Sequence, residues 1–307
     1  MKVLVTGASG MLGSAIARLA THAEHQVLRP NHRELDLEQE IPTLEYLKFH
    51  RPDAIFHCAA KVGGISANVA NPFDFLTKNI RMDASLLGAA KELEIQNLIY
   101  MGSSCMYPKN VPHAMSESEI LSGPLEPTNE GYALAKLVGW KTVQFMAKTF
   151  TWRSFILSNL YGPNDHFEPG RSHLLAAIIE KIHKAKISDS KSVDMWGDGS
   201  AKREFTFVED VALFLVQSLE RLNDFPDTLN VGAGVDYSVL DYYKLVSQLM
   251  NYNGEIVADL SKPTGMNRKL MDITRAQDFG WTPHTNIKTG IQKTVAWYEE
   301  KMEHGTL

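Results

Sequence analysis

A tyrosine, a lysine and a serine in this chain have the spacing that proton donation to a carbonyl group requires. Tyr132 and Lys136 lie four residues apart in GYALAK, on one face of a predicted helix. A lysine ammonium beside a phenol favours the phenolate, which predicts a lowered pKa for Tyr132 and makes it a usable general acid. Ser103 lies near the end of the apolar run NLIYMGSS, which we interpret as a buried strand whose carboxyl end faces a ligand.

Cys105 follows Ser103 by two residues and should lie at the rim of the same pocket. It could be merely a small apolar residue, as we expect for Cys58 inside the apolar run IFHCAA. A thiolate next to a ketone can instead remove the proton from the adjacent carbon, because donors such as Ser103 and Tyr132 stabilise the resulting enolate. We therefore predict that Cys105 is a base, and neither a nucleophile nor a redox switch.

Inversion of a carbon also needs a group on its opposite face that returns the proton. His173 opens the helical segment HLLAAI after the loop YGPND, where it can face a cleft. A lone histidine is usually a surface or capping residue, and that interpretation stays open for His173. We predict that His173 is the acid that complements Cys105.

A glycine-rich turn, TGASGMLG at residues 6–13, follows the apolar run KVLV and opens a helical stretch. At the first strand-to-helix turn of a parallel sheet, Gly7 permits the tight turn and Gly10 lets the backbone approach a pyrophosphate. Gly13 allows close packing of the helix. This glycine spacing is similar to that of the short-chain dehydrogenase/reductase superfamily, where it marks the nucleotide site.

The next predicted strand, HQVLR, ends in Arg29, and Arg33 lies close behind. An acidic residue at this place would select NAD by accepting from the ribose 2′-hydroxyl, whereas cationic side chains can bind a 2′-phosphate. The two arginines therefore favour NADP(H), although they could also be solvated surface residues.

Short apolar runs alternate with amphipathic helical segments, which predicts an α/β fold with a doubly wound parallel (Rossmann) sheet and a smaller C-terminal α/β domain. Long helices are expected over 71–93, 129–150 and 172–186, with Ser238 as the N-cap of a later one. We assign residues 1–163 and 205–231 to an NADP(H)-binding domain, and residues 164–204 and 232–307 to a nucleotide-sugar-binding domain.

Composition excludes several classes of function. The formal net charge of −5 and the absence of a lysine/arginine run argue against nucleic acid and membrane surfaces as partners. The chain has two cysteines, which exclude a disulfide framework and favour the cytoplasm. Without an apolar leader or a membrane-length apolar segment, we expect a soluble, unprocessed chain, and we assign no metal ligands.

Several motifs together resemble those of the GDP-L-fucose synthase family, which are epimerase-reductases of the extended short-chain dehydrogenase/reductase superfamily. They are AAKVGGI, GSSCMYPK, LEPTNEGYALAK, NLYGPND, SHLL, WGDG, KREF, NVGAGVDYS and KPTGMNRKLMD. The likeness runs from Val3 to about Trp281. It implies an NADPH-dependent conversion of GDP-4-keto-6-deoxy-D-mannose to GDP-L-fucose, by inversion of C3 and C5 and then reduction of the keto group at C4.

The resemblance also implies a role for each matching residue. Cys105 would be the base, His173 the acid and Tyr132 the proton donor to the C4 oxygen, with Ser103 and Lys136 in support. Cofactor contacts are implied for Gly7, Ser9, Gly10, Met11, Leu12, Gly13, Arg29, Arg33, Ala59, Ala60, Lys136, Leu157, Asn159, Leu160 and His173. Substrate contacts are implied for Asn159, Lys181, Trp196, Arg203 and Lys269, although Trp196 could be packing and the cations could be surface charge.

Two positions depart from the family pattern, since Ser9 stands where an arginine is often found and Thr264 where an aspartate is common. Relatives that act on GDP-linked dideoxy sugars (towards colitose) or deoxyheptoses are therefore alternatives. A simple nucleotide-sugar 4-reductase, a non-reducing epimerase and a non-catalytic nucleotide-binding protein are others. The superfamily also implies a homodimer through the helices at 71–91 and 129–150, whose apolar faces could equally be core.

Overall fold

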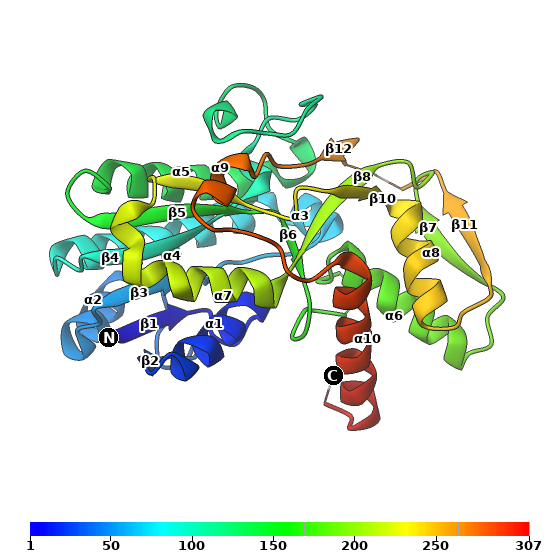
Figure 1. Cartoon of the computed structure of the whole chain (residues 1–307), viewed down its shortest axis with the longest axis horizontal. Coiled ribbons are helices and arrows are strands. Elements are labelled where there is room, and N and C mark those ends of the chain that lie inside the picture. Colours follow the sequence, from blue (N-terminus) through cyan, green and yellow to red (C-terminus); the bar gives the residue numbers. More distant parts are fainter. Residues whose placement is uncertain (169, 263–264, 307) are drawn as a thin grey trace.

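The central sheet consists of parallel strands flanked by helices on both faces (Figure 1). The computed structural model describes residues 1–168, 170–262 and 265–306, so Thr264 lies outside the described residues. The six strands run in the order β2 (Gln26–Leu28), β1 (Lys2–Thr6), β3 (Ala54–His57), β4 (Asn97–Ser103), β5 (Thr151–Leu157) and β9 (Thr228–Val231). The chain order reverses between β1 and β3, which is where open α/β sheets bind their ligands.

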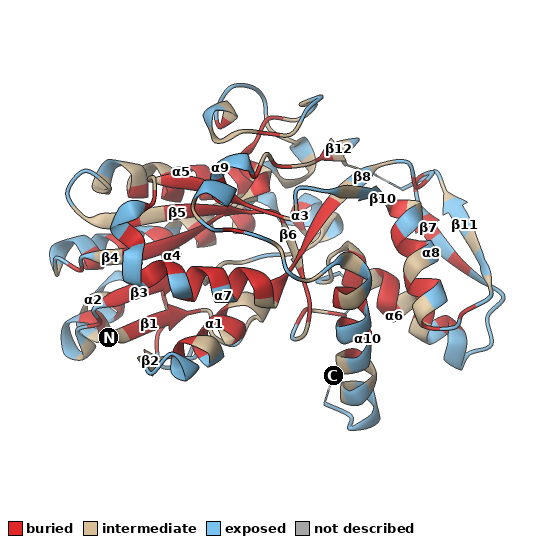
Figure 2. Cartoon of the chain, viewed as in Figure 1, coloured by how far each residue is buried: buried red, intermediate tan, exposed pale blue. Residues whose placement is uncertain are grey.

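Alternate side chains of each strand enter two separate cores, because successive strand residues point to opposite faces. Val3 and Val5 pack in the core under α1 (Met11–His22) and α7 (Val208–Ser218), whereas Leu4 packs in the other. That second core lies under α2 (Glu40–His50), α4 (Pro72–Glu92) and α5 (Glu130–Met146). Figure 2 shows the strands buried between these layers. The predicted doubly wound α/β fold is confirmed.

A third core lies beside the central sheet, on the right in Figure 1. Its helices are α6 (Leu174–Ile187), α8 (Val239–Leu249) and α10 (Ile287–Glu303). Its central strand, β8 (Lys202–Phe207), pairs with β6 (Asn159–Tyr161), β10 (Asp236–Ser238) and β12 (Arg268–Lys269), while β7 (Ser192–Trp196) pairs with β11 (Glu255–Asp259). The remaining elements are α3 (Ile65–Ala70), α9 (Thr274–Asp278), η1 (Ser104–Met106), η2 (Glu117–Glu119), η3 (Pro127–Asn129) and η4 (Leu219–Asp224).

The predicted helices match α4, α5 and α6 to within a few residues at each end, and Ser238 caps α8 by accepting from Asp241 N at 3.0 Å. Two local predictions are wrong. The run RSFILSNL is not one strand, because the chain leaves the central sheet at Ser158 and continues as β6 beside β8. Cys58 is not inside a strand, since β3 ends at His57, and burial raises the pKa of its thiol to about 12.

Candidate active site at the carboxyl ends of the strands

The glycine turn leaves room for a phosphate at the start of α1. Gly7 has a left-handed backbone with φ +65°, and an added Cβ would lie 2.8 Å from Ala59 Cα. A Cβ at Gly13 would lie 2.2 Å from the Gly7 carbonyl oxygen, so both positions require glycine. Gly10 starts α1 without a side-chain cap, and a Cβ there would meet only the Gly7 oxygen, at 3.4 Å. The turn therefore fits a dinucleotide pyrophosphate.

The other predicted cofactor residues surround this turn. Arg29 and Arg33 are exposed beyond β2, and within the described residues neither forms an ion pair, so both are accessible to a 2′-phosphate. Ser9 is exposed in the turn, whereas Met11, Leu12 and Leu160 pack partly against the core beneath it. Ala59 and Ala60 follow β3 next to Gly7, and Leu157 ends β5.

Ser103, Cys105 and Tyr132 meet at the carboxyl end of β4. Ser103 caps the short helix η1, and its Oγ accepts from Cys105 N at 3.2 Å. The Ser103 hydroxyl also hydrogen-bonds the Tyr132 phenol, and Lys136 lies one turn further along α5 with its side chain buried. The predicted grouping of these residues is therefore present in the structure.

The predicted lowering of the Tyr132 pKa is wrong. Burial raises this pKa above its ordinary value, the neighbouring Cys105 raises it further, and only the hydrogen bond from Ser103 lowers it. The Lys136 ammonium lies instead 4.6 Å from the centre of the Tyr100 ring and interacts with Asp83. Its charge thus interacts with the buried Asp83, a neighbour that the YxxxK spacing does not indicate.

Two donors point at the sulfur of Cys105. Asn129 Nδ2 donates to Sγ at 3.0 Å, and Lys269 Nζ donates to it at 3.2 Å. Lys269, which the resemblance places on GDP, thus lies in the catalytic group. Sequence reasoning missed Asn129, although its position one helical turn before Tyr132 could have revealed it. Both contacts would stabilise negative charge on the sulfur.

His173 stands at the N-cap of α6 without capping it through its side chain. Burial, together with the charges of Lys269 and His166, lowers its pKa to about 4. The imidazole is therefore neutral at pH 7. Because Lys269 also touches Cys105, one cation is near both members of the predicted acid–base pair.

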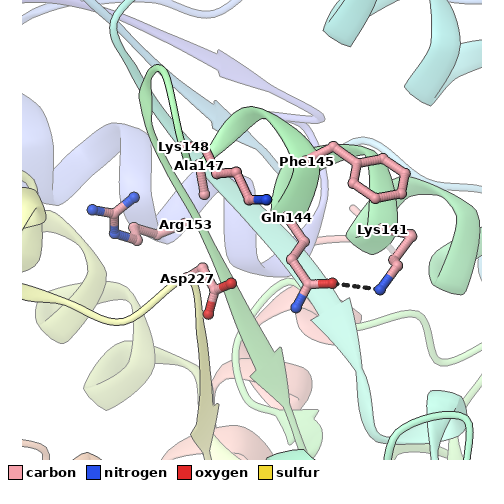
Figure 3. A pocket seen from close by; sticks show the side chains of 7 residues that line it. All are labelled: Lys141, Gln144, Phe145, Ala147, Lys148, Arg153 and Asp227. Carbon is pink, nitrogen blue, oxygen red and sulfur yellow. Dashed lines mark hydrogen bonds between the residues drawn. The ribbon is translucent and has the colours of Figure 1, made fainter.

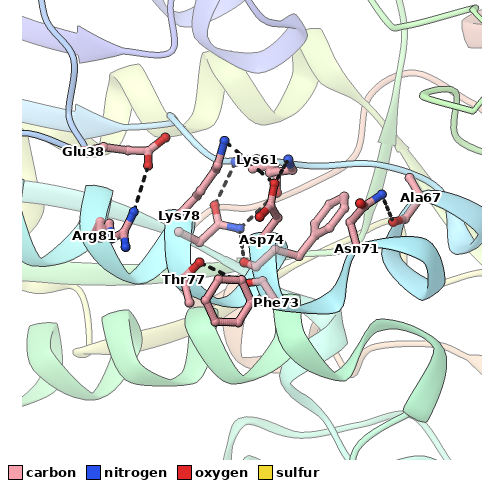
Figure 4. A network of polar contacts seen from close by, with 11 residues as sticks. Glu38, Lys61, Ala67, Asn71, Phe73, Asp74, Thr77, Lys78 and Arg81 are labelled. Carbon is pink, nitrogen blue, oxygen red and sulfur yellow. Dashed lines mark hydrogen bonds and ion pairs between the residues drawn. The ribbon is translucent and has the colours of Figure 1, made fainter.

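The turn after β3 is fixed between α4 and the loop before His173. Lys61 Nζ pairs with Asp74 at 3.2 Å (Figure 4). In addition, Lys61 N donates to Asn79 Oδ1 at 2.8 Å. On the other side, a Cβ at Gly64 would lie 2.9 Å from the Ser172 carbonyl oxygen. A hollow of about 370 Å³ between this turn and the side that carries His166, Gly170 and Arg171 borders the site.

The residues expected at the nucleotide form two groups in the structure. Lys181 Nζ bonds Asp194 Oδ2 at 2.7 Å and lies 5.8 Å from the ring of Trp196, which is 37% exposed and so accessible for stacking. Arg203 pairs in register with Lys269 across β8 and β12, nearer Cys105. Asn159 is held by β8, since its Nδ2 donates to the Glu204 carbonyl oxygen at 2.9 Å.

A second hollow, of about 470 Å³, lies at the opposite end of α5 from Tyr132 (Figure 3). None of the predicted site residues lines it, and it is surrounded by Lys141, Gln144, Phe145, Ala147, Lys148, Arg153 and Asp227. Across the described ranges, no group of three or more histidine, cysteine or carboxylate side chains could bind a metal. In the same ranges, the helices are too short or too polar to cross a membrane.

Comparison with known proteins identifies relatives over nearly the whole chain. The model of the NAD dependent epimerase/dehydratase family matches residues 3–232. The chain is 44% identical to the GDP-L-fucose synthase of Azorhizobium caulinodans, over 97% of this chain and 96% of that protein. It is 42% identical to the GDP-L-colitose synthase of Yersinia pseudotuberculosis, over 97% and 98%. The solved GDP-mannoheptose C4 reductase of Campylobacter jejuni with NADP bound superimposes with a TM-score of 0.86 at 26% identity, over 97% and 98%.

Proposed function

The chain belongs to the NAD dependent epimerase/dehydratase family and, within it, to the GDP-L-fucose synthase family, and we propose that it converts GDP-4-keto-6-deoxy-D-mannose to GDP-L-fucose with NADPH. The observation that carries this proposal is the placement of Cys105 and His173 around Lys269, next to Ser103 and Tyr132. A reductase needs only the serine, the tyrosine and a lysine, whereas an acid–base pair is needed for inversion.

In the first stage, Cys105 removes the proton from C3, and the electron pair moves onto the C4 oxygen, where Ser103 and Tyr132 donate to it. His173, once protonated to imidazolium, returns a proton to the opposite face of C3, and the same sequence inverts C5. Each inversion leaves a proton on Cys105 and takes one from His173, so exchange with water must reset the pair. One ketone activates both carbons, which is why one site can perform both inversions.

In the second stage, the keto group is reduced. NADPH, when bound, supplies the hydride for C4. Tyr132 gives the phenolic proton to the C4 oxygen, and Ser103 holds that oxygen by a hydrogen bond. The glycine turn and Lys136 would hold the cofactor, and Arg29 and Arg33 would bind its 2′-phosphate.

We propose that the GDP moiety binds between two groups of residues, Lys181 with Trp196 and Arg203 with Lys269. Trp196 would stack on guanine or ribose, and Lys181 and Arg203 would meet the diphosphate, with Asn159 at the sugar. Residues 164–204 and 232–307 would form this nucleotide-sugar-binding domain, and residues 1–163 and 205–231 the NADP(H)-binding domain.

We also propose a homodimer through α4 and α5, and a cytoplasmic location. Large apolar side chains remain exposed on these adjacent helices, with Phe73 at 71%, Phe145 at 60% and Val138 at 49%. Such faces are typical of two-fold interfaces. Free thiols at Cys58 and Cys105 are consistent with a reducing compartment.

A related GDP-4-keto sugar is the second candidate substrate. The identity to the GDP-L-colitose synthase, 42%, is almost as high as the 44% to a GDP-L-fucose synthase. Substrates of the colitose or deoxyheptose type would use the same residues.

The test combines the protein, GDP-4-keto-6-deoxy-D-mannose and NADPH in deuterated water. NADPH oxidation with GDP-L-fucose labelled at C3 and C5, read by NMR, is the expected result. Oxidation without label would indicate a simple 4-reductase and would remove the base and acid roles of Cys105 and His173. No reaction would reject this substrate, and the dideoxy and heptose analogues would be tested next.

A further inference from the structure

A buried hydrogen-bonded chain of polar side chains lies directly beneath the catalytic helix and takes no part in the proposed reaction. Asp83 lies in the middle of α4 with only 3% of its surface exposed, and His57 is fully buried. Asp83 Oδ1 contacts His57 Nε2 at 2.9 Å, and Oδ2 accepts from the Tyr100 hydroxyl at 2.6 Å. A buried carboxylate lowers stability unless its charge is compensated, so a group of opposite charge must lie nearby.

The chain of hydrogen bonds continues from His57 to Thr6. Thr6 Oγ1 accepts from Ala59 N at 3.1 Å and hydrogen-bonds His57 Nδ1 at 2.8 Å. Burial raises the pKa of Asp83, but the charge of Lys136 and the hydrogen bonds from His57 and Tyr100 lower it below its ordinary value. Asp83 is therefore ionised.

His57 contacts Asp83 directly, and the charge of Lys136 is the largest of the effects that lower the pKa of this carboxyl. The side chain of Lys136 is 2% exposed, and its Nζ lies 4.6 Å from the centre of the ring of Tyr100, whose hydroxyl binds Asp83. The helix that carries Lys136 touches the same carboxylate, because a Cβ at Gly139 would lie 2.3 Å from Asp83 Oδ2 and 2.2 Å from the Tyr100 hydroxyl. Only glycine permits this approach.

We infer that Asp83, oriented by His57 and Tyr100, is a positioning residue that keeps Lys136 in its ammonium form during carbonyl reduction. This inference rests on the proposed function, in which Lys136 holds the cofactor beside Tyr132. Asp83 touches neither substrate nor cofactor in this role and acts through Lys136 alone.

The direction of the expected effect follows from the groups that face Lys136. They are Asp83 of α4, Tyr100 of β4 and Cys58 after β3, with Tyr132 one turn earlier on α5. Burial lowers the pKa of Lys136, and Asp83 raises it. Asp83 also raises the pKa of Tyr132. Removal of its charge therefore lets both groups lose their protons at lower pH.

The kinetic test compares Asp83→Asn with Tyr100→Phe. The plot of kcat for NADPH oxidation against pH should fall at high pH, and in D83N we expect this alkaline limb to lie at least about one pH unit lower. At a given pH on that limb, kcat would then be about tenfold lower. Y100F removes one hydrogen bond to Asp83 but keeps the carboxylate charge and the ring beneath Lys136, so its limb should stay in place. If Asp83 had a purely structural role, D83N would melt at a lower temperature while its alkaline limb stayed in place. That result would overturn the inference.

A second test needs no substrate and applies even where D83N is unstable. Lys136→Met leaves Asp83 buried without its cation, so K136M should melt at a lower temperature than the double variant D83N/K136M. Additive losses of melting temperature would show that the two residues are not coupled. If the protein reduces none of the sugars, the proposed function fails while this cycle still decides the coupling.

Discussion

Asn129→Ala tests whether the donors on Cys105 support the epimerisation. Asn129 Nδ2 donates to the sulfur at 3.0 Å, and Lys269 is the other donor, at 3.2 Å. A hydrogen bond to a charged group contributes about 1.5–3 kcal/mol, which corresponds to about a 10- to 150-fold loss in the rate of proton removal by a thiolate. Asn129→Asp should lose more, because a carboxylate would repel the negative sulfur.

The assay separates epimerisation from reduction. Deuterium incorporation at C3 and C5 without NADPH measures the inversions alone. NADPH oxidation measures reduction, provided that the unmodified protein has first brought the substrate to epimerisation equilibrium. The rate of reduction by N129A should stay within about threefold of that of the unmodified protein. Thr128→Ala is the matched control, since among the residues that the structure describes the Thr128 hydroxyl bonds only Glu126, at 3.1 Å. Exchange in N129A within twofold of the unmodified protein would refute the reasoning, and so would equal losses in both reactions.

Three further predictions concern charges elsewhere in the site and beneath it. Lys269→Met removes a charge that lowers the pKa of His173, so an NMR titration should show this pKa rising from about 4 towards 6.5; an unchanged value would place Lys269 too far away to act. Burial raises the pKa of Asp165 to about 7, above its unfolded value, so its ionisation destabilises the fold as pH rises from about 4 to 7. Asp165→Asn should therefore increase the free energy of unfolding in urea by about 2–3 kcal/mol more at pH 8 than at pH 5, and equal gains would contradict this. Arg29→Glu should raise the KM for NADPH at least about tenfold and lower that for NADH, whereas unchanged values would make Arg29 a solvated surface residue.

Sequence alone predicted the parts of the fold and site that depend on local pattern. The Rossmann sheet follows from apolar runs that alternate with helices, and the contact between Ser103 and Cys105 spans two residues. The contact between Lys269 and Cys105 could not be predicted in this way. These residues are 164 positions apart, and the pairing of β12 with β8 brings them together.

The direction of charge interactions was also beyond sequence reasoning. The YxxxK spacing correctly places Tyr132 and Lys136 on one helix face, but it does not show which neighbour the ammonium interacts with. That neighbour, Asp83, is one of three carboxylates in α4, and the sequence pattern does not distinguish it from the other two. Only the packing of α4 against α5 shows that Lys136 faces a buried anion.

The two lysines of the site have different electrostatic tasks. Asp83 compensates the charge of Lys136, so this lysine can stay protonated in a buried position near the residues that carry out reduction. Lys269 is close to Cys105 and His173, where it stabilises a negative sulfur and disfavours a positive imidazole. Because the inversions need a proton on His173, the same cation that assists the base opposes the acid.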